Sequence, residues 1–536
     1  MITPDEGTAL IVAGNAVLGV ELGSTRIKAC LIGENPADVL AVGEHAWESA
    51  FVDGRWTYPL DEVWSGVQSA YRNLADCVRE SFGVEIRRLR ALGISAMMHG
   101  YLAFDASGEP LVPFRTWRNT STGPASAALT ALFGQNIPLR WSVAHLQQAV
   151  LDHEPHVPQI DFLTTLAGYV HWRLTGRRVL GVGDASGMFP IDAATGSYDR
   201  ELVARYDRFV AADVPGLRLR TLLPDVLPAG MPAGELTVGG AALLDPAGRL
   251  LPGVPLCPPE GDAGTGMVAT GAIAPRTGNV SAGTSIFAMV VLERPLQRVH
   301  REIDVVTTPA GSPVAMVHCN NGASELAAWA RVFARFAAAA GALLSSDEVF
   351  DVLFHEALTG DADAGGLLAY NYLAGETITG IDAGRPLFIR TPDSTFTLAN
   401  MMRAQLYGVF GTLAMGMRAL AYEGVRLDRM YAHGGMFRTA GVAQRFLAAA
   451  LGAPVAVGES ASEGGAWGIA VLAAYLSESA DMDLARYLAE RVFADAQIDV
   501  VAPLPDDVAG FGVYLHRYRA GLAVEHAAVA HLTSDL

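Results

Sequence analysis

The stretch VLGVELGSTRIKACLI, residues 17–32, contains two short apolar runs separated by a Gly-Ser-Thr turn. This pattern predicts two strands, over Val17–Gly23 and Arg26–Ile32, that open a sheet. Lys28 in the second strand is the only lysine among the 38 lysine and arginine residues of the chain. One ammonium group beside a small, hydroxyl-rich turn indicates a phosphate site, whereas the alternative is an ordinary surface lysine. Other parts of the sequence have to decide between the two.

The neighbours of Lys28 exclude one class of phosphate site and disfavour a second kind of lysine chemistry. A Walker-type phosphate loop needs Gly-Lys followed by Ser or Thr, but Lys28 follows Ile27 and precedes Ala29. An enzyme that forms a lysine Schiff base would have to use Lys28, which its place in a strand pattern disfavours.

Composition narrows the function classes. The length of 536 residues predicts two domains of about 250 residues each. A net charge of -18 argues against nucleic acid and anionic membranes as partners, since both require a basic surface. The four cysteines form no CxxC pair, so a zinc site or a disulfide framework is not expected. Reduced thiols are typical of a cytoplasmic protein, and we expect this location. No run reaches the roughly 18 apolar residues of a membrane span.

The order of patterns predicts an α/β chain. Leu60–Phe82 has apolar residues on one helical face and ends before Gly83, so it predicts a helix. Strands are expected over Val39–Ala46 and Leu89–Ser95. Residues 1–16 lack the basic start of a signal peptide and are expected to be a loose tail.

A second copy of the opening pattern lies in the other half of the chain. The stretch GNVSAGTSIFAMVVLE, residues 278–293, is again strand, glycine with hydroxyl residues, and strand, and Gly283 lies 260 positions after Gly23. We therefore expect a duplicated fold with domains over 17–272 and 273–536. Its two turns are expected to face each other across a cleft and to offer N–H groups to one polyphosphate.

A competing pattern for dinucleotide binding is also present. Residues 264–269 satisfy G-x-G-x-x-A, which requires a preceding strand. The preceding residues 257–260 contain two prolines, which lack the ladder N–H, and no acidic strand end follows about 20 residues later. We interpret this match as accidental.

An ordered series of motifs over roughly residues 17–475 resembles the FGGY family of carbohydrate kinases. Residues 21–28, ELGSTRIK, are similar to the first phosphate motif of that family, Asp-x-Gly-Thr/Ser-Thr/Ser-x-x-Lys/Arg. Glu21 stands where the family usually has Asp. The resemblance implies that Gly23, Ser24, Thr25 and Lys28 bind ATP and that Glu21 holds Mg²⁺ through water.

Three segments resemble the family's sugar-binding and catalytic elements. SAMMHGYLAFD, which includes Met98 and His99, looks like the stretch that lines the sugar pocket of the xylulokinase branch, with Met97 in place of Gln. FRTWRNTST resembles the Trp-x-Asp/Asn element, and PPEGDAGTGMVATG resembles the segment with the catalytic aspartate. The resemblance implies Asp262 as catalytic base and the following sugar contacts: Met98, His99, Trp117, Arg118, Asn119 and Asp262.

The second half resembles the ATP-binding half of the family. Gly283, Thr284 and Ser285 match the second phosphate motif, and AHGGMFRT resembles the adenosine motif. YNYLAGETI, residues 370–378, is similar to the Tyr-Leu-x-Gly-Glu segment, and residues 459–474 resemble the helix behind the adenine pocket. The resemblance implies ATP contacts by Gly283, Thr284, Ser285, Gly434, Gly435 and Met436.

The resemblance implies a fold of two duplicated ribonuclease H-like domains of the actin, hexokinase and Hsp70 type. It implies ATP- and Mg²⁺-dependent phosphorylation of a sugar hydroxyl, with a ketopentose such as D-xylulose as the first candidate. Another ketose, a polyol or a sugar acid is an alternative substrate. An ATP-binding regulator or ATPase without sugar transfer is a second alternative, which Glu21 and Met97 favour. The expected partners are the sugar and ATP, and a homodimer is compatible with this reading.

Overall fold

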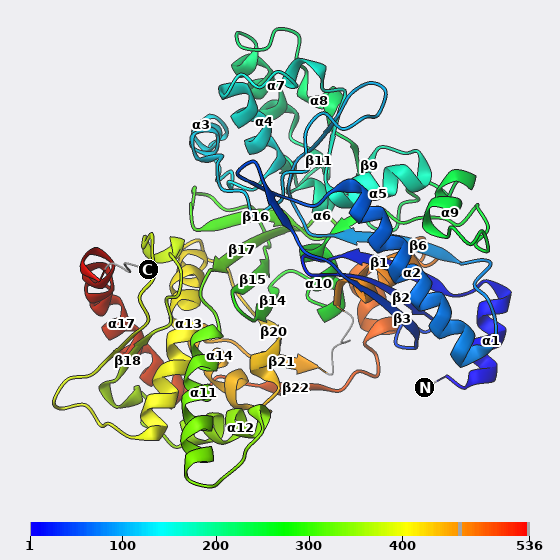
Figure 1. Ribbon diagram of the computed structural model, residues 1–536. Coiled ribbons are helices and arrows are strands. Elements are labelled where there is room, and N and C mark those ends of the chain that lie inside the picture. Colours follow the sequence, from blue (N-terminus) through cyan, green and yellow to red (C-terminus); the bar gives the residue numbers. More distant parts are fainter. Residues whose placement is uncertain (1, 459–463, 533–536) are drawn as a thin grey trace. The chain divides into compact units, whose positions relative to one another are not determined.

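The opening strand pair lies at the centre of a five-stranded sheet with the order β13-β6-β1-β2-β3 (Figure 1). Strand β1 pairs antiparallel with β2 and parallel with β6. The bounds are β1 (Val17–Leu22), β2 (Arg26–Ile32), β3 (Val39–Ala46), β6 (Ala91–Ala96) and β13 (Glu260–Gly261). The strand-turn-strand pattern predicted from the sequence is confirmed to within one residue.

The computed structural model describes residues 2–458 and 464–532, which form two compact units. The first unit comprises Met1–Ala274, Val305–Val314 and Ser460–Ala496. The second comprises Pro275–Asp304, Ala315–Glu459 and Gln497–Leu536. The first unit's main segment ends two residues after the expected boundary at 272, but two later segments also belong to it.

Helices pack closely on both faces of the first sheet. A Cβ added at Gly43 of β3 would lie 2.2 Å from the Ala70 carbonyl oxygen of α2 (Leu60–Phe82). A Cβ added at Gly19 of β1 would lie 2.1 Å from the Ala466 carbonyl oxygen of α15 (Gly464–Tyr475). Glycine at these positions therefore allows each helix backbone to approach the sheet directly.

The structure corrects the expectation of a loose tail over residues 1–16. Helix α1 (Pro4–Ala13) begins with a capping box in which Thr3 and Glu6 each accept the other's backbone N–H. Its Ile11 is 1% exposed and belongs to the first unit's core. The Thr-x-x-Glu spacing was a readable signal for this helix.

The first unit contains further helices and short strands. The helices are α3 (Gly123–Phe133), α4 (Ser142–Leu151), α5 (Leu166–Thr175), α6 (Val182–Ala185), α7 (Arg200–Val210), α8 (Leu219–Leu222), α9 (Val238–Leu244), α10 (Asp262–Thr270) and α16 (Leu484–Tyr487). The strands are β4 (Ala50–Val52), β5 (Arg55–Thr57), β7 (Leu102–Phe104), β8 (Phe162–Thr164), β9 (Val179–Gly181), β10 (Ile191–Asp192), β11 (Ser197–Tyr198) and β12 (Asp225–Leu227).

The second sheet repeats the pairing of the first. Its order is β16-β17-β15-β14-β20-β21-β22, and β14 pairs antiparallel with β15 and parallel with β20, as β1 does with β2 and β6. This common topology supports the duplication inferred from the two turns. The bounds are β14 (Thr277–Ala282), β15 (Ile286–Val291), β16 (Ile303–Thr307), β17 (Pro313–Cys319), β20 (Arg429–His433), β21 (Val455–Gly458) and β22 (Ile498–Val501).

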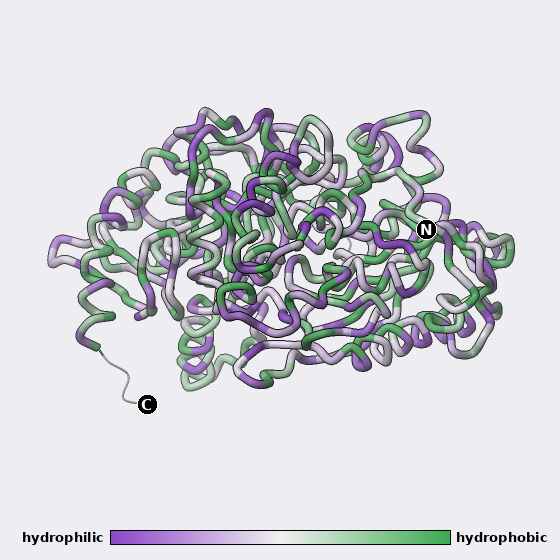
Figure 2. The backbone as a smooth tube through the Cα atoms, turned by 90° about the horizontal axis from the view of Figure 1, so that it is seen from above, coloured by the Kyte–Doolittle hydropathy of each residue, from purple (hydrophilic) through white to green (hydrophobic). Residues whose placement is uncertain are grey.

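Long helices provide much of the second unit's core. Most residues of α13 are buried, and it contributes a continuous set of apolar side chains to that core. Among residues 2–458 and 464–532, no helix is long and apolar enough to cross a membrane, and Figure 2 shows hydrophobic and hydrophilic residues mixed along most of the chain. The remaining elements are α11 (Ser324–Ala339), α12 (Ser346–Ala357), α13 (Leu398–Tyr422), α14 (Val442–Leu451), α17 (Pro505–His531), β18 (Leu368–Tyr370) and β19 (Leu387–Ile389).

Candidate functional site

The first predicted phosphate turn has two backbone donors without acceptors. The Gly23 N–H donates to the Arg26 carbonyl oxygen at 2.9 Å and closes the hairpin between β1 and β2. Within the described part of the chain, the N–H groups of Ser24 and Thr25 donate to no other residue. Adjacent free N–H groups in a turn are typical of anion-binding concavities. This geometry supports the predicted contacts of Gly23, Ser24 and Thr25 with phosphate.

Lys28 lies on the sheet face that α15 covers. Its strand partners are Glu21 on β1 and Glu44 on β3, and its Nζ lies 3.6 Å from a carboxylate oxygen of Glu44. The neighbours Ile27 and Ala29 point into the core on the opposite face. The structure therefore places Lys28 beside the turn in an ion pair, and its contact with phosphate stays a prediction.

Glu21 receives the amino terminus of α15. One carboxylate oxygen accepts the Ala466 N–H at 3.1 Å, and a Cβ added at Gly465 would lie 2.3 Å from the other oxygen. Burial and the charge of Asp262 raise the pKa of Glu21, whereas Lys28 and the Ala466 N–H lower it, and the net pKa is about 7. The carboxylate most affected by burial in this stretch thus lies close to the residue predicted as catalytic base.

Asp262 is the first residue of α10 and has one occupied and one open carboxylate oxygen. Its Oδ1 accepts the N–H groups of Met98 at 3.1 Å and of Ala263 at 2.9 Å. Its Oδ2 has no hydrogen-bond partner among the described residues. Burial raises the pKa of Asp262, and the N–H bonds to Oδ1 oppose that shift. The open oxygen is suited to accept a proton from a substrate hydroxyl.

His99 has a backbone conformation that is rare for histidine. Its φ is 71° and that of Gly100 is 96°, so two successive residues are left-handed. His99 Nδ1 lies 3.4 Å from the Gly187 carbonyl oxygen, a pure acceptor, and therefore carries the hydrogen. Burial holds the pKa of His99 well below its usual value, and nearby Arg140 lowers it further. The imidazole is neutral, and its Nε2 presents a lone pair.

Two glycines bring the predicted sugar and catalytic residues together. A Cβ added at Gly187 would lie 2.5 Å from His99 Nδ1, and one added at Gly261 would lie 2.7 Å from Met98 Cγ. Met98 and Asp262 are thus in direct contact, with His99 next to Met98 in the chain, and their roles toward a sugar stay predictions. The close approaches at the two glycines could not be predicted, because neither glycine occurs in a periodic or repeated pattern.

The segment Trp117–Asn119 contacts the hairpin of β4 and β5. The Asn119 amide bonds both the N–H and the carbonyl of Trp56, each at 2.8 Å, and Arg118 stacks 3.6 Å from the centre of the Trp56 ring. Trp117 packs partly buried against the first core. None of these contacts involves Asp262, so the predicted sugar contacts of the three residues stay predictions.

The second phosphate turn is held by the residues that precede α11. The carbonyl oxygens of Gly283 and Thr284 accept the N–H groups of Ala323 and Gly322, both at 2.8 Å. In a trans peptide the C=O and the following N–H point in opposite directions. The N–H groups of Thr284 and Ser285 therefore point away from α11, and within the described residues they have no acceptor.

A buried amide network supports this second turn. Glu376 accepts the N–H of Asn320 at 2.9 Å and a side-chain N–H of Asn321 at 3.2 Å, while Asn371 donates to the Gly322 carbonyl at 2.8 Å. Burial raises the pKa of Glu376, and its bonds with Asn321 and Asn320 oppose the shift. The YNYLAGETI segment thus fixes the loop that holds the turn.

The predicted adenosine residues divide into two groups. Gly434 has a φ of 112°, and a Cβ there would lie 2.4 Å from the Ala282 carbonyl oxygen, one residue before the second turn. Gly435 begins a short 3₁₀ helix, and Met436 is 4% exposed in the second core. Gly434 thus lies beside the second turn and the Met436 side chain belongs to the core, and the ATP contacts of all three residues stay predictions.

The helix predicted behind the adenine pocket belongs to the first unit. The described part of residues 459–474 is α15, which packs on β1, and residues 459–463 lie outside the described residues. The competing dinucleotide pattern at 264–269 lies inside α10, so its glycines form no phosphate loop.

Two buried carboxylates escaped the sequence analysis as a pair. Glu260 accepts the N–H groups of Gly183 at 3.2 Å and Asp184 at 2.9 Å, and Asp184 accepts the Thr165 hydroxyl at 2.6 Å. Burial raises the pKa of Glu260 to about 8 and that of Asp184 to about 7. These contacts anchor the two-residue strand β13 directly before Asp262.

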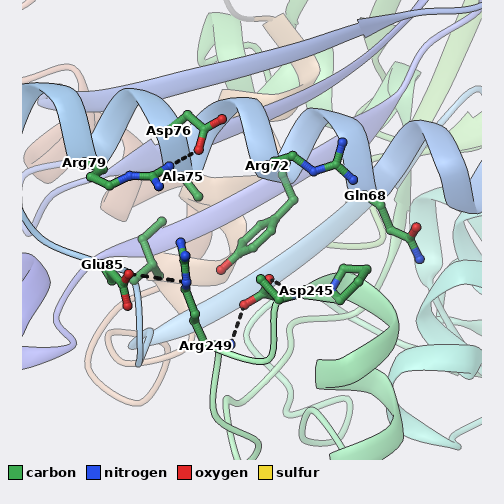
Figure 3. A pocket seen from close by; sticks show the side chains of 12 residues that line it. Gln68, Arg72, Ala75, Asp76, Arg79, Glu85, Asp245 and Arg249 are labelled. Atoms are coloured by element: carbon green, nitrogen blue, oxygen red, sulfur yellow. Dashed lines mark hydrogen bonds and ion pairs between the residues drawn. The ribbon is translucent and has the colours of Figure 1, made fainter.

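A pocket of about 210 Å³ in the first unit is separate from these residues (Figure 3). It lies between α2 and the turn after α9, and none of the predicted site residues lines it. Arg249 pairs with Glu85 at 3.3 Å, and the Asp245 carboxylate accepts the Arg249 N–H at 2.8 Å. Three arginines and three carboxylates line the pocket, so it carries no net charge toward a ligand.

Comparison with known proteins agrees with this arrangement. Residues 16–262 match the N-terminal domain of the FGGY family of carbohydrate kinases, and residues 278–477 match its C-terminal domain. The chain belongs to the FGGY family. Its fold is the two-domain, actin- and hexokinase-like ATPase fold of that family.

Individual FGGY relatives are distant from this chain. The xylulose kinase of Streptomyces coelicolor is 26% identical over 264 residues, 45% of this chain and 52% of the relative. The xylulose kinase structure of Rhodospirillum rubrum aligns with a TM-score of 0.77 at 20% identity. The alignment covers 96% of this chain and 100% of the Rhodospirillum rubrum chain. The gluconate kinase structure of Lactobacillus acidophilus has a TM-score of 0.76 at 18% identity, with coverage of 96% and 99%. The FGGY chain spans about half the length of the curated relatives it matches.

Proposed function

We propose that the chain transfers the γ-phosphoryl group of ATP to a hydroxyl group of a small sugar. The observation that carries this proposal is the Asp262 carboxylate. Its Oδ1 accepts the Met98 N–H, and we assign Oδ2, which has no partner among the described residues, to the hydroxyl of a substrate beside Met98 and His99. A base with one fixed and one open oxygen, next to a neutral hydrogen-bond acceptor, suits an alcohol substrate.

In this reaction the sugar oxygen forms a bond with the γ-phosphorus, and the bond from that phosphorus to the bridging oxygen of ADP breaks. The hydroxyl proton passes to Asp262 Oδ2. The transition state of such a transfer is loose, so orientation of the hydroxyl by Asp262 precedes its deprotonation. The free N–H groups of Ser24 and Thr25, and those of Thr284 and Ser285, are donors for the phosphate oxygens.

Magnesium fits the carboxylates beside the first turn. The charge of Asp262 raises the pKa of Glu21, and a nearby dication would favour the ionised form of Glu21. The described residues contain no cluster of three or more His, Cys, Asp or Glu side chains for a metal. Mg²⁺ in such sites is usually bound by one or two carboxylates together with the phosphates of the nucleotide, and Glu21 would hold it here through water. When bound, Mg²⁺ neutralises charge on the phosphates.

The sugar that we propose first is a ketopentose such as D-xylulose. The named relatives include xylulose kinases, and the neutral His99 offers an acceptor to one sugar hydroxyl. Other ketoses, polyols and sugar acids are the competing substrates, as the gluconate kinase of similar fold illustrates.

A coupled assay of ADP release across pentuloses, hexuloses, polyols and aldonates tests this proposal. We expect sugar-dependent ADP release that is highest with a pentulose. Release that is highest with an aldonate or polyol would correct the substrate, and release that no sugar stimulates would contradict the kinase activity.

An ATPase or ATP-binding regulator is the second candidate. Glu21 favours it, because its carboxylate accepts the Ala466 N–H of α15 and so is partly engaged within the protein. ADP release at the same rate with and without every sugar would support this candidate.

A further inference from the structure

The carbonyl groups of the first phosphate turn are all held by two aromatic residues. The Trp47 indole N–H donates to the Gly23 carbonyl oxygen at 2.7 Å, and the Tyr58 hydroxyl donates to the Ser24 carbonyl oxygen at 2.7 Å. The backbone N–H of Trp47 donates to the Thr25 carbonyl oxygen at 3.2 Å. Three successive peptide groups are thereby fixed.

These bonds determine where the free donors of the turn point. Because each trans peptide directs its C=O and the next N–H to opposite sides, the N–H groups of Ser24 and Thr25 point away from the aromatic pair. A turn without these bonds would lose the common orientation of its donors. An anion site gains affinity when its donors are oriented before binding, since less ordering remains to be done.

The aromatic pair is itself rigid. The ring centres of Trp47 and Tyr58 lie 4.3 Å apart with an angle of 32° between the planes, and the residues are 6% and 1% exposed. Trp47 follows the last residue of β3, and Tyr58 follows the last residue of β5. Asn119 bonds both backbone groups of Trp56, two residues before Tyr58, so the segment that carries Tyr58 is fixed as well.

The second turn achieves the same orientation by other means. There the carbonyls of Gly283 and Thr284 accept backbone N–H groups of Ala323 and Gly322. The first turn relies on side chains for two of its three carbonyl bonds, so substitutions at Trp47 and Tyr58 can release it selectively.

We propose that Trp47 and Tyr58 are positioning residues that aim the N–H groups of Ser24 and Thr25 at the phosphates of a nucleotide. The inference rests on the proposed function only in the identity of that ligand. Neither aromatic side chain touches the phosphate in this account, because both act on the opposite side of the peptide groups.

The test uses Tyr58→Phe, which removes one hydroxyl and keeps the ring stack, together with Trp47→Phe. We expect each variant to raise the KM for ATP about 5- to 30-fold, the effect of a buried carbonyl left without its donor. The KM for the sugar should change less than about twofold, because Asp262 and His99 are not held by this pair. Tyr475→Phe is the matched control, since its hydroxyl donates to the Met482 carbonyl at 2.8 Å away from the turn.

A second readout does not depend on nucleotide. Deuterium uptake of the segment 22–27 should rise in Tyr58→Phe and stay at the wild-type level in Tyr475→Phe, because the Gly23 N–H loses protection when the turn loosens. If the wild-type protein binds no ATP, the proposed function is wrong. Deuterium uptake still tests whether Trp47 and Tyr58 hold the turn. Unchanged uptake, or an ATP KM in Tyr58→Phe equal to that in Tyr475→Phe, would overturn the inference.

Discussion

Glu21 shows how one residue ties the stability of this protein to pH. Its carboxylate accepts the Ala466 N–H in the first turn of α15. Its pKa of about 7, against an ordinary 4.5, means that burial opposes its negative charge. A group whose pKa is higher in the folded than in the unfolded protein makes its full contribution to the free energy of unfolding below the unfolded-state pKa. This contribution is lost as pH rises through the folded-state pKa.

We therefore predict that the Glu21→Gln variant becomes more stable than the wild type as pH rises from about 4.5 to 7. The gain at pH 8 should be about 1–3 kcal/mol, with little difference at pH 4.5, because the amide never ionises and still accepts the Ala466 N–H. Thermal unfolding of both proteins across this pH range measures the effect. Parallel stability curves would show that Glu21 ionises normally.

The sequence motifs single out Asp262 and His99 as candidate site residues, since these motifs have characteristic neighbours and order. Their roles in binding and catalysis stay predictions. Gly187 and Tyr58 were not singled out, because a close approach or a bond to a carbonyl depends on which segments meet in the fold. For the same reason the bonds between Asn119 and Trp56 could not be predicted from the sequence, and the sugar contact of Asn119 stays a prediction.

At the scale of elements, local sequence signals predicted where a helix begins and ends. They did not predict which elements pack together. Helix α2 begins at Leu60 and ends at Phe82 as predicted, because Pro59 and Gly83 flank one continuous apolar face. The membership of α15 in the first unit was not predictable, since it depends on glycines of β1 and β6 far away in the sequence.

The contact between the second turn and the residues before α11 gives an element-scale prediction. A Cβ added at Gly322 would lie 2.3 Å from the Gly283 carbonyl oxygen and 2.8 Å from that of Thr284. Gly322→Ala should therefore displace the turn, lower the affinity for ATP about tenfold and leave the sugar KM near its wild-type value.

The matched control for this variant is Gly512→Ala in α17, where an added Cβ meets nothing within 4 Å. It should bind ATP normally and gain up to about 1 kcal/mol of stability from helix propensity. Isothermal titration with ATP compares the two variants. Normal ATP affinity in Gly322→Ala would show that the second turn tolerates the shift or does not bind the nucleotide.

At the scale of the whole chain, two sheets with one topology each place a strand-turn-strand unit at their centre. The sequence predicted this repeat from two glycine turns 260 positions apart, and the matching pairings of β1 and β14 support it. The discontinuous composition of the first unit could not be expressed as one boundary in the sequence, because two segments after residue 274 also belong to this unit.

Turnover of the Asp262→Asn variant measures whether Asp262 is the base of a sugar kinase, as proposed. The asparagine keeps an oxygen for the Met98 N–H but cannot take up the proton, so ADP release with the preferred sugar should fall about 10²- to 10⁴-fold. ATP affinity should remain normal, and Asp61→Asn, an exposed change in α2, should keep full activity. Near-normal turnover in Asp262→Asn would show that Asp262 is not the catalytic base.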